Sequence, residues 1–235
     1  MNRRLGILGG TFDPIHRGHL DLGTAAHEAL RLTSVLVLPS HVPPHRPQTS
    51  ASAFHRFAMA AMAVSGQRGW EVSDLELNAP GPSYTSHTLQ RLLDTGYMPG
   101  ELFFVIGADA FADIESWRDY PELLSLANFA VVSRPGHSVR DLPMRVPRLA
   151  DRFANSTNAA RGETTSIFLI DALTADVSST IIRERLLAHL SVDGLVPERV
   201  QQHIEQHRLY RSPIPTRRAA DLSSHPAAGR LHGED

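Results

Sequence analysis

A strand-to-helix junction near the start of the chain constrains the fold more than any other feature. Residues 4–8 read Arg-Leu-Gly-Ile-Leu, an apolar run that predicts a short buried strand. Residues 9–20 follow directly and read Gly-Gly-Thr-Phe-Asp-Pro-Ile-His-Arg-Gly-His-Leu. From Leu20 to Leu30, Leu, Ala and Glu recur at helical spacing, which predicts a helix.

The residues of this junction have the chemistry of an anion site. Gly9 and Gly10 allow the backbone to turn and a ligand to approach the main chain closely. His16 and His19 lie three residues apart at the helix start, where free N–H groups and the helix dipole favour anions. Gly18 between them is expected to leave room for a bulky negative group. The pattern predicts a phosphate site at which two imidazoles donate hydrogen bonds to developing charge.

Two other interpretations of the histidine pair have to be weighed. Three-residue spacing without a nearby Cys, Glu or third His argues against zinc, so the sequence predicts no metal site. The chain has 13 histidines, so on the pair alone these could be ordinary surface residues. The lead-in Gly-Gly-Thr-Phe-Asp-Pro favours the phosphate site instead.

Composition narrows the class of protein. A chain of 235 residues with 42% hydrophobic content is expected to form one α/β domain with a full core. A net charge of −2 and an isoelectric point near 6.7 indicate no nucleic-acid partner. No apolar run is long enough to cross a bilayer and no signal peptide is recognisable, so a cytoplasmic location without membrane contact is expected. Cysteine is absent, which excludes disulfides and thiolate chemistry.

Lysine is also absent, because all 23 basic residues are arginine. A Walker A phosphate loop requires its lysine, and a Schiff-base enzyme requires an amine. The lysine-bearing second motif of class I aminoacyl-tRNA synthetases, which share a similar His-x-Gly-His element, is likewise excluded.

Beyond the junction, the patterning predicts alternating strands and helices. Buried strands are predicted at 35–38, 102–106, 129–132 and 167–169, and shorter alternating strands at 70–72 and 75–77. Helices are predicted over 53–64, 84–95, 181–190 and 197–206, with another beginning at Pro121. Segment 137–164 is predicted to be an irregular surface excursion. Residues 212–235 are predicted to be a disordered tail after a domain spanning 1–211.

Several polar residues are predicted to lie where strands or loops meet helices. Gly107 and Asp109 follow the strand 102–106, at the carboxyl end where open α/β sheets bind ligands. Arg56 on the helix 53–64 could face the site or solvent, and solvent is the default expectation. Thr85 fits a helix N-cap, and Trp117 is by default a core residue.

A second cluster of hydroxyls precedes the helix at 181–190. Ser178, Ser179 and Thr180 fit N-caps, but with Arg183 in the first turn they also fit an anion cradle.

Two motifs resemble those of a known family. Gly-Thr-Phe-Asp-Pro-x-His-x-Gly-His, at residues 10–19, resembles the signature of the nucleotidyltransferase superfamily with the HxGH motif. Ser-Ser-Thr-Ile-Ile-Arg, at 178–183, resembles the second motif of that superfamily. Within it, residues 4–211 are most similar to bacterial nicotinate-nucleotide adenylyltransferases. The resemblance implies a Rossmann-like, doubly wound, mostly parallel α/β sheet in a single domain.

The resemblance also implies a reaction and a set of site residues. The reaction is ATP + nicotinate mononucleotide → nicotinate adenine dinucleotide + pyrophosphate, with Mg²⁺ accompanying ATP. The implied catalytic residues are His16, His19 and Arg183. The implied ATP-binding residues are Gly9, Gly10, Thr11, Phe12, His16, His19, Gly107, Asp109, Arg134, Ser178, Ser179, Thr180 and Arg183. The implied mononucleotide-binding residues are Thr11, His45, Arg46, Tyr84, Thr85 and Trp117.

Alternatives to this function remain. A sister enzyme could use nicotinamide mononucleotide or phosphopantetheine as acceptor, although the segment 84–88 and Trp117 argue against phosphopantetheine. A non-catalytic nucleotide sensor on the same fold is a third reading. The intact set of His16, His19 and Arg183 argues against it. The sequence is compatible with a homo-oligomer without indicating one.

Overall fold

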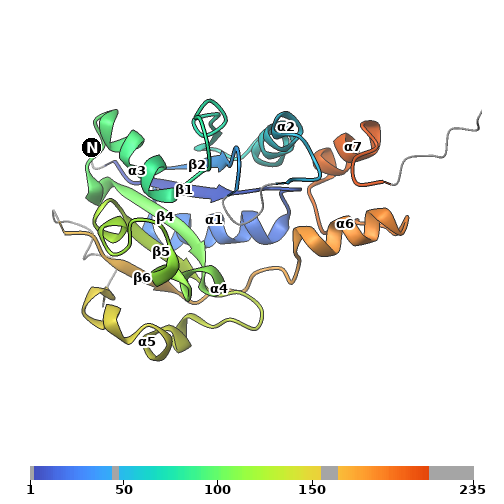
Figure 1. Ribbon diagram of the computed structural model, residues 1–235. Helices are drawn as coiled ribbons and strands as arrows, with labels where there is room; N and C mark the ends of the chain where they lie inside the picture. The colour runs from blue at the N-terminus through green and yellow to red at the C-terminus, as the bar shows by residue number, and fades with distance from the viewer. Residues whose placement is uncertain (1–2, 44–47, 155–163, 212–235) are drawn as a thin grey trace, which may run out of the picture.

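A six-stranded parallel sheet forms the centre of the molecule. The computed structural model describes residues 3–43, 48–154 and 164–211 (Figure 1). The strand order is β3-β2-β1-β4-β5-β6, and every neighbouring pair is parallel. The strands are β1 (Leu5–Gly10), β2 (Ser34–Pro39), β3 (Trp70–Val72), β4 (Leu102–Gly107), β5 (Asn128–Val132) and β6 (Ile167–Ile170). The predicted doubly wound fold is confirmed.

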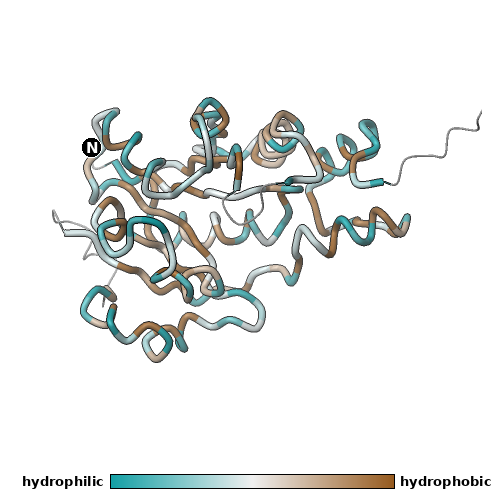
Figure 2. Tube along the Cα trace, viewed as in Figure 1, coloured by the Kyte–Doolittle hydropathy of each residue, from teal (hydrophilic) through white to brown (hydrophobic). Residues whose placement is uncertain are grey.

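Side chains alternate between the two faces of the sheet along each strand, which produces one core layer on each face. In β4, for example, Phe103 and Val105 belong to one core cluster while Phe104 and Ile106 belong to the other. This is the period of two that places successive side chains on opposite faces. Figure 2 shows the apolar residues concentrated in these central strands.

Helices cover both faces. The first core layer packs against α1 (Arg17–Leu30), α2 (Ala53–Val64), α6 (Ser179–Leu187) and α7 (Glu198–Gln206). The second packs against α3 (Thr85–Asp94), α4 (Ala108–Phe111) and α5 (Leu142–Arg145). Short 3₁₀ turns lie at Pro99–Glu101, Ile114–Ser116, Glu122–Ser125, Val139–Asp141 and Pro147–Arg152. Among the described residues, none of the helices has the length and apolarity required to cross a bilayer.

Three predicted elements are wrong. Residues 75–77 form turns instead of a strand, and Glu76 in their centre is buried. The segment after Pro121 is a 3₁₀ turn, not an α-helix. The described part of 137–164 is not a surface excursion, because its apolar residues at helical spacing enter the second core layer. These are Val139, Leu142, Val146 and Leu149.

The sheet has its topological switch point between β1 and β4, where the chain order reverses. Open α/β sheets bind ligands outside the carboxyl ends of the strands at such a point. β1 ends there at Gly10 and β4 ends there at Gly107, so the predicted glycine turn and the predicted strand end both lie at the switch.

Candidate active site

A cleft of about 850 Å³ opens at this edge of the sheet. Its volume falls within the usual range for small-molecule sites. Most of the predicted site residues line it: Gly9, Gly10, Thr11, Phe12, His16, His19, Tyr84, Thr85, Trp117, Arg134, Ser178, Ser179 and Thr180. Gly107, Asp109 and Arg183 are not among the lining residues. His45 and Arg46 lie outside the described residues, so their predicted contacts stay predictions.

The two histidines of the first motif are stacked on each other. Their ring centroids are 3.6 Å apart, and Phe12 meets the His19 ring edge-on at 5.0 Å. His19 Nδ1 accepts a hydrogen bond of 3.2 Å from the backbone N–H of His16. An imidazole that accepts at Nδ1 carries its proton on Nε2, so neutral His19 is a donor at Nε2.

Gly18 has a different role from the one predicted. A Cβ at this position would lie 3.2 Å from His16 Nδ1 and 3.3 Å from the Ala175 carbonyl oxygen. The missing side chain therefore makes room for the His16 ring and for the segment that leads to α6. It does not make room for a ligand.

Both histidines are neutral near pH 7. Burial, followed by the nearby Arg134 guanidinium, lowers the pKa of His16 to about 3. Burial also holds the pKa of His19 well below its ordinary value, with His16 and Arg134 adding to the effect. A neutral pair can donate hydrogen bonds to phosphate without a standing positive charge of its own. The positive charge at this end of the cleft comes from arginine.

This protonation behaviour predicts a stability effect of acid on the ligand-free protein. The folded pKa of His16 is below the ordinary 6.5, so its contribution is fully present above pH 6.5 and is lost as pH falls toward 3. Between pH 7 and pH 5, His16 should lower the free energy of unfolding by about 2 kcal/mol. Urea denaturation of wild type and His16→Gln at both pH values measures this term. Equal losses in the two proteins would contradict it.

Asp13 fixes the loop between β1 and the histidines. It is 1% exposed, and its carboxylate accepts hydrogen bonds from the backbone N–H groups of Ser50 (2.7 Å) and Ala51 (3.0 Å). The Tyr210 hydroxyl donates a third bond of 2.8 Å from the C-terminal end of the described chain. Burial, with the Asp13 carboxylate next, raises the pKa of Tyr210, so Tyr210 stays protonated as a donor.

The second motif is tied directly to the first. Arg183 Nη1 donates to the Asp13 carbonyl oxygen at 2.8 Å, and the Ser179 hydroxyl donates to the Pro14 carbonyl oxygen at 2.9 Å. Arg183 Nη2 donates to the Thr180 hydroxyl at 3.1 Å. The structure thereby joins segments about 170 residues apart in the sequence.

The hydroxyls of the second motif divide between capping and lining. Ser178 caps α6, because its hydroxyl accepts from the Ile181 N–H at 3.2 Å. Within the described chain, the backbone N–H groups of Ser179 and Thr180 have no recorded hydrogen bond, and both residues line the cleft. The start of α6 therefore presents two free donors and a positive dipole end to the cleft.

Arg134 connects β5 to the same place. Its Nη1 lies 3.3 Å from Asp109 Oδ2, and its Nη2 donates to the Val177 carbonyl oxygen at 3.4 Å. Gly107 is needed for this pair, since a Cβ there would collide with the Asp109 carboxylate and lie 2.6 Å from Arg134 Cδ. Asp109 Oδ1 is buried and has no hydrogen-bond partner within residues 3–43, 48–154 and 164–211. Gly107 and Asp109 thus support the lining residue Arg134.

The far end of the cleft is aromatic. Trp117 is partly exposed and meets Phe104 edge-on at 6.1 Å, so it is not the core residue that composition alone favours. The Arg118 guanidinium lies over the Tyr84 ring at 4.6 Å. Tyr84 and Thr85 also line the cleft, and Tyr84 instead of Thr85 takes the N-cap position of α3.

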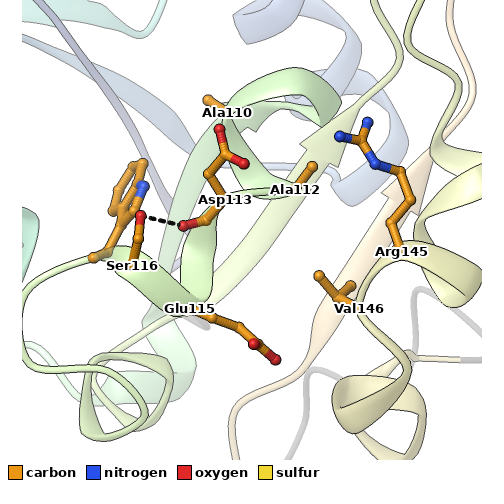
Figure 3. Close-up of a pocket in the computed structure, with 8 residues that line it drawn as sticks. Ala110, Ala112, Asp113, Glu115, Ser116, Arg145 and Val146 are labelled. Carbon is orange, nitrogen blue, oxygen red and sulfur yellow. Dashed lines mark hydrogen bonds between the residues drawn. The ribbon is translucent and has the colours of Figure 1, made fainter.

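A second cavity, of about 640 Å³, adjoins the aromatic end and shares Ala110, Ser116 and Trp117 with the cleft. Figure 3 shows Asp113 and Glu115 on one side of it and Arg145 on the other. We regard it as an extension behind the Trp117 segment.

Among the residues at the site that were not predicted, three are buried and polar or charged. Arg56 is fully buried instead of facing solvent, and it donates to the carbonyl oxygens of Thr11 (2.7 Å) and His41 (3.2 Å). Glu76 lines the cleft, receives a 2.7 Å bond from Thr88, and has its pKa raised by burial. Ser40, directly after β2, has a buried hydroxyl that finds no partner among the described residues. Only Ser40 carried a usable signal, its position at the carboxyl end of a strand.

Comparison with known proteins agrees with this geometry. The family model described as cytidylyltransferase-like matches residues 7–185. A probable nicotinate-nucleotide adenylyltransferase from Roseiflexus sp. (strain RS-1) is 41% identical over 208 residues, covering 88% of this chain and 98% of the relative. A second, from Desulfatibacillum aliphaticivorans, is 38% identical and covers 88% and 99%.

Solved structures show the same fold. Plasmodium falciparum nicotinic acid mononucleotide adenylyltransferase, complexed with NaAD, aligns with a TM-score of 0.63 at 17% identity, covering 88% of this chain and 97% of that one. The same enzyme complexed with APC aligns with a TM-score of 0.62. The sequence matches extend over most of the chain, and the structure joins both motifs at the switch point. The chain therefore belongs to the nicotinate-nucleotide adenylyltransferases of the cytidylyltransferase-like family.

Proposed function

We propose that this chain transfers the adenylyl group of ATP to nicotinate mononucleotide, forming nicotinate adenine dinucleotide and pyrophosphate. The observation that carries the proposal is the junction of the two motifs. Neutral donors from His16 and His19 face the same cleft as the free N–H groups at the start of α6.

The reaction requires no protein nucleophile. A phosphate oxygen of the mononucleotide attacks the α-phosphorus of ATP and forms a new P–O bond. The bond between the α-phosphorus and the oxygen bridging to the β-phosphate breaks, and its electron pair leaves with pyrophosphate. Catalysis then consists of positioning the two substrates in line and stabilising the charge that develops on the leaving oxygens.

The residues divide this work along the cleft. We assign the Nε2–H of His19 to the α-phosphate region and His16 to the adjacent triphosphate oxygens. The free N–H groups of Ser179 and Thr180, with Arg183 behind them, are assigned to the β- and γ-phosphates. Thr11 and the amides beside it are assigned to the acceptor phosphate, while Gly9, Gly10 and Phe12 shape the floor.

Arg134 and its supports are assigned to the adenine nucleotide. Mg²⁺ would enter with ATP as part of the substrate and would neutralise part of the phosphate charge. Among the described residues, Asp109 Oδ1 has no hydrogen-bond partner, and a carboxylate oxygen can coordinate Mg²⁺ or accept a hydrogen bond from one of its waters, so the site fits such an ion.

The aromatic end is assigned to the pyridine ring, which predicts a selective effect of Trp117→Ala. Stacking on an aromatic face is worth about 1–3 kcal/mol, so KM for the mononucleotide should rise about 5- to 150-fold while KM for ATP changes little. Steady-state kinetics with each substrate varied in turn measures this. Trp117→Phe, which keeps a ring, should lose less. Equal losses for both substrates with a lowered Tm would instead identify a packing residue.

One assay tests the proposed function as a whole. Pyrophosphate release from ATP is measured in parallel with nicotinate mononucleotide, nicotinamide mononucleotide and phosphopantetheine. We expect the highest kcat/KM with nicotinate mononucleotide. Preference for another acceptor would reassign the substrate, and ATP binding without turnover on any acceptor would identify a nucleotide sensor.

A further inference from the structure

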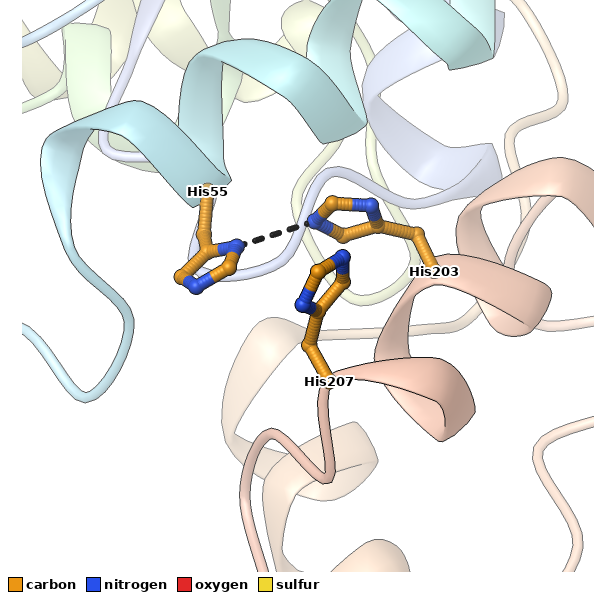
Figure 4. Close-up of side chains that lie close together, drawn as sticks. All are labelled: His55, His203 and His207. Carbon is orange, nitrogen blue, oxygen red and sulfur yellow. Dashed lines mark hydrogen bonds between the residues drawn. The ribbon is translucent and has the colours of Figure 1, made fainter.

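Three histidines outside the cleft come together where α2 meets α7. His55 lies in the first turn of α2, while His203 and His207 lie at the end of α7. One ring nitrogen from each lies within 4.8 Å of the others. Figure 4 shows the three rings turned toward one another, with His55 Nδ1 3.1 Å from His203 Nε2.

The distances between the ring nitrogens are also close to those of a metal site. Zn–N bonds of about 2.0–2.1 Å at tetrahedral angles place ligand nitrogens about 3.3–3.4 Å apart. The observed 3.1 Å and the 4.8 Å limit bracket this value, so a small rotation of a ring suffices. A hydrogen bond accounts for His55 and His203 only. Within the described chain, no side-chain hydrogen bond is recorded for His207.

The spacing on α7 supports the same conclusion. Residues four apart lie on one face of a helix, so His203 and His207 present their rings to the same partner. Their ring centroids are 4.4 Å apart, and those of His55 and His207 are 4.8 Å apart. Two ligands from one helix and a third from a neighbouring helix form a compact three-nitrogen set.

The three rings are also available to a metal ion. In the described part of the chain, none of the three rings has a recorded ion pair with a carboxylate. Neutral imidazole is the ligand form.

We propose that His55, His203 and His207 bind a divalent transition-metal ion of the Zn²⁺ class. Three imidazoles leave the fourth tetrahedral position to water. His203 is buried, His55 is partly buried and His207 is exposed, so the ion reaches the site from solvent on the His207 side.

The ion would link α7 to α2, which contacts the first motif. Three residues beyond His207, Tyr210 donates to Asp13 in the first motif. On α2, the residue after His55 is Arg56, which donates to the Thr11 carbonyl oxygen. Metal binding should therefore stabilise α2 and the segment after α7, whose contacts position the loop between β1 and α1.

The test uses the full-length chain without a purification tag, stripped with EDTA and titrated with Zn²⁺ by calorimetry and by competition with a chelator. We expect one equivalent bound with submicromolar Kd. Co²⁺ in the same site should give the visible absorption bands of tetrahedral coordination. At a free metal concentration 100 times Kd, Tm should rise by about 5–10 °C.

Variants locate the site. His207→Gln and His55→Gln should each weaken Zn²⁺ binding by more than about 100-fold, because loss of a direct ligand exceeds the usual effect of its supporting residues. His207 is exposed, so in EDTA the Tm of His207→Gln should stay within about 2 °C of wild type.

Two controls complete the design. His189→Asn removes an exposed histidine at a left-handed position that asparagine tolerates, and it should bind Zn²⁺ like wild type. A double change of His225 and His232 to Gln removes the histidines beyond the described chain. Wild-type binding no tighter than that of His207→Gln would overturn the proposal. Loss of binding only in the double variant would overturn it as well.

Discussion

His19→Ala is expected to lower kcat by about 10²–10³ while leaving the fold and most of ATP binding intact. Charge moves onto the oxygens between the α- and β-phosphates only as pyrophosphate departs. A preorganised donor aimed at them therefore binds the transition state better than the ground state. The loss corresponds to about 2.7–4 kcal/mol, the usual effect of removing one such donor. The neutral ring, with its proton held on Nε2 by the His16 N–H, is what provides this preorganisation.

Two comparisons separate catalysis from binding. His19→Gln retains a donor and should lose less than the alanine variant, and His27→Gln changes another histidine of α1 away from the cleft and should behave like wild type. Calorimetry gives ATP affinity, and single-turnover kinetics gives the rate at saturation. Loss of ATP binding with an unchanged rate would make His19 a binding residue only. No change in either would mean that the histidine pair has no role in the reaction.

The sequence predicts those parts of the molecule whose local residue pattern matches the environment that they have in the folded protein. Strands buried on both faces read as continuous apolar runs, so β1, β2, β4, β5 and β6 were all predictable within a few residues. The two motifs lie at helix starts, where glycine, hydroxyl and histidine residues have few local alternatives. Their assembly at one cleft follows from the rule that parallel strands present their carboxyl ends at one edge.

The failures occur where long-range contacts decide the outcome. Residues 75–77 alternate like a strand, but Arg91 binds the Leu75 carbonyl oxygen and Thr88 binds Glu76, which fixes the segment as turns against α3. Arg56 donates to the carbonyl oxygens of Thr11 and His41. No local sequence pattern around Arg56 indicates backbone acceptors that distant from it in the sequence.

The histidine cluster illustrates the same limit. The prediction of no metal site rested on the spacing of His16 and His19. His203 and His207 show the four-residue spacing of helical ligands, but the third member, His55, is 148 residues from His203. Only the packing of α2 against α7 brings it into reach.

Asp13→Ala should be the most destabilising single change in the first motif. It removes the acceptor of the buried Ala51 N–H and of the partly buried Ser50 N–H and Tyr210 hydroxyl. It also removes the carboxylate that offsets the cost of burying the Arg56 charge. Unsatisfied buried donors cost about 1–3 kcal/mol each and are partly relieved by relaxation, so we expect the free energy of unfolding to fall by about 3–5 kcal/mol. Urea denaturation measures the loss.

Matched variants show whether this loss comes from the hydrogen-bond network. Tyr210→Phe removes one donor and should cost about 1 kcal/mol, whereas Asp151→Ala removes an exposed carboxylate and should cost less than about 0.5 kcal/mol. The double variant of Asp13 and Tyr210 should lose less than the sum of the two single changes, because removing the hydroxyl eliminates one of the orphaned donors. Additive losses would show that the two side chains are not coupled. A loss for Asp13→Ala as small as that for Asp151→Ala would mean that the loop holding His16 and His19 is fixed by other contacts.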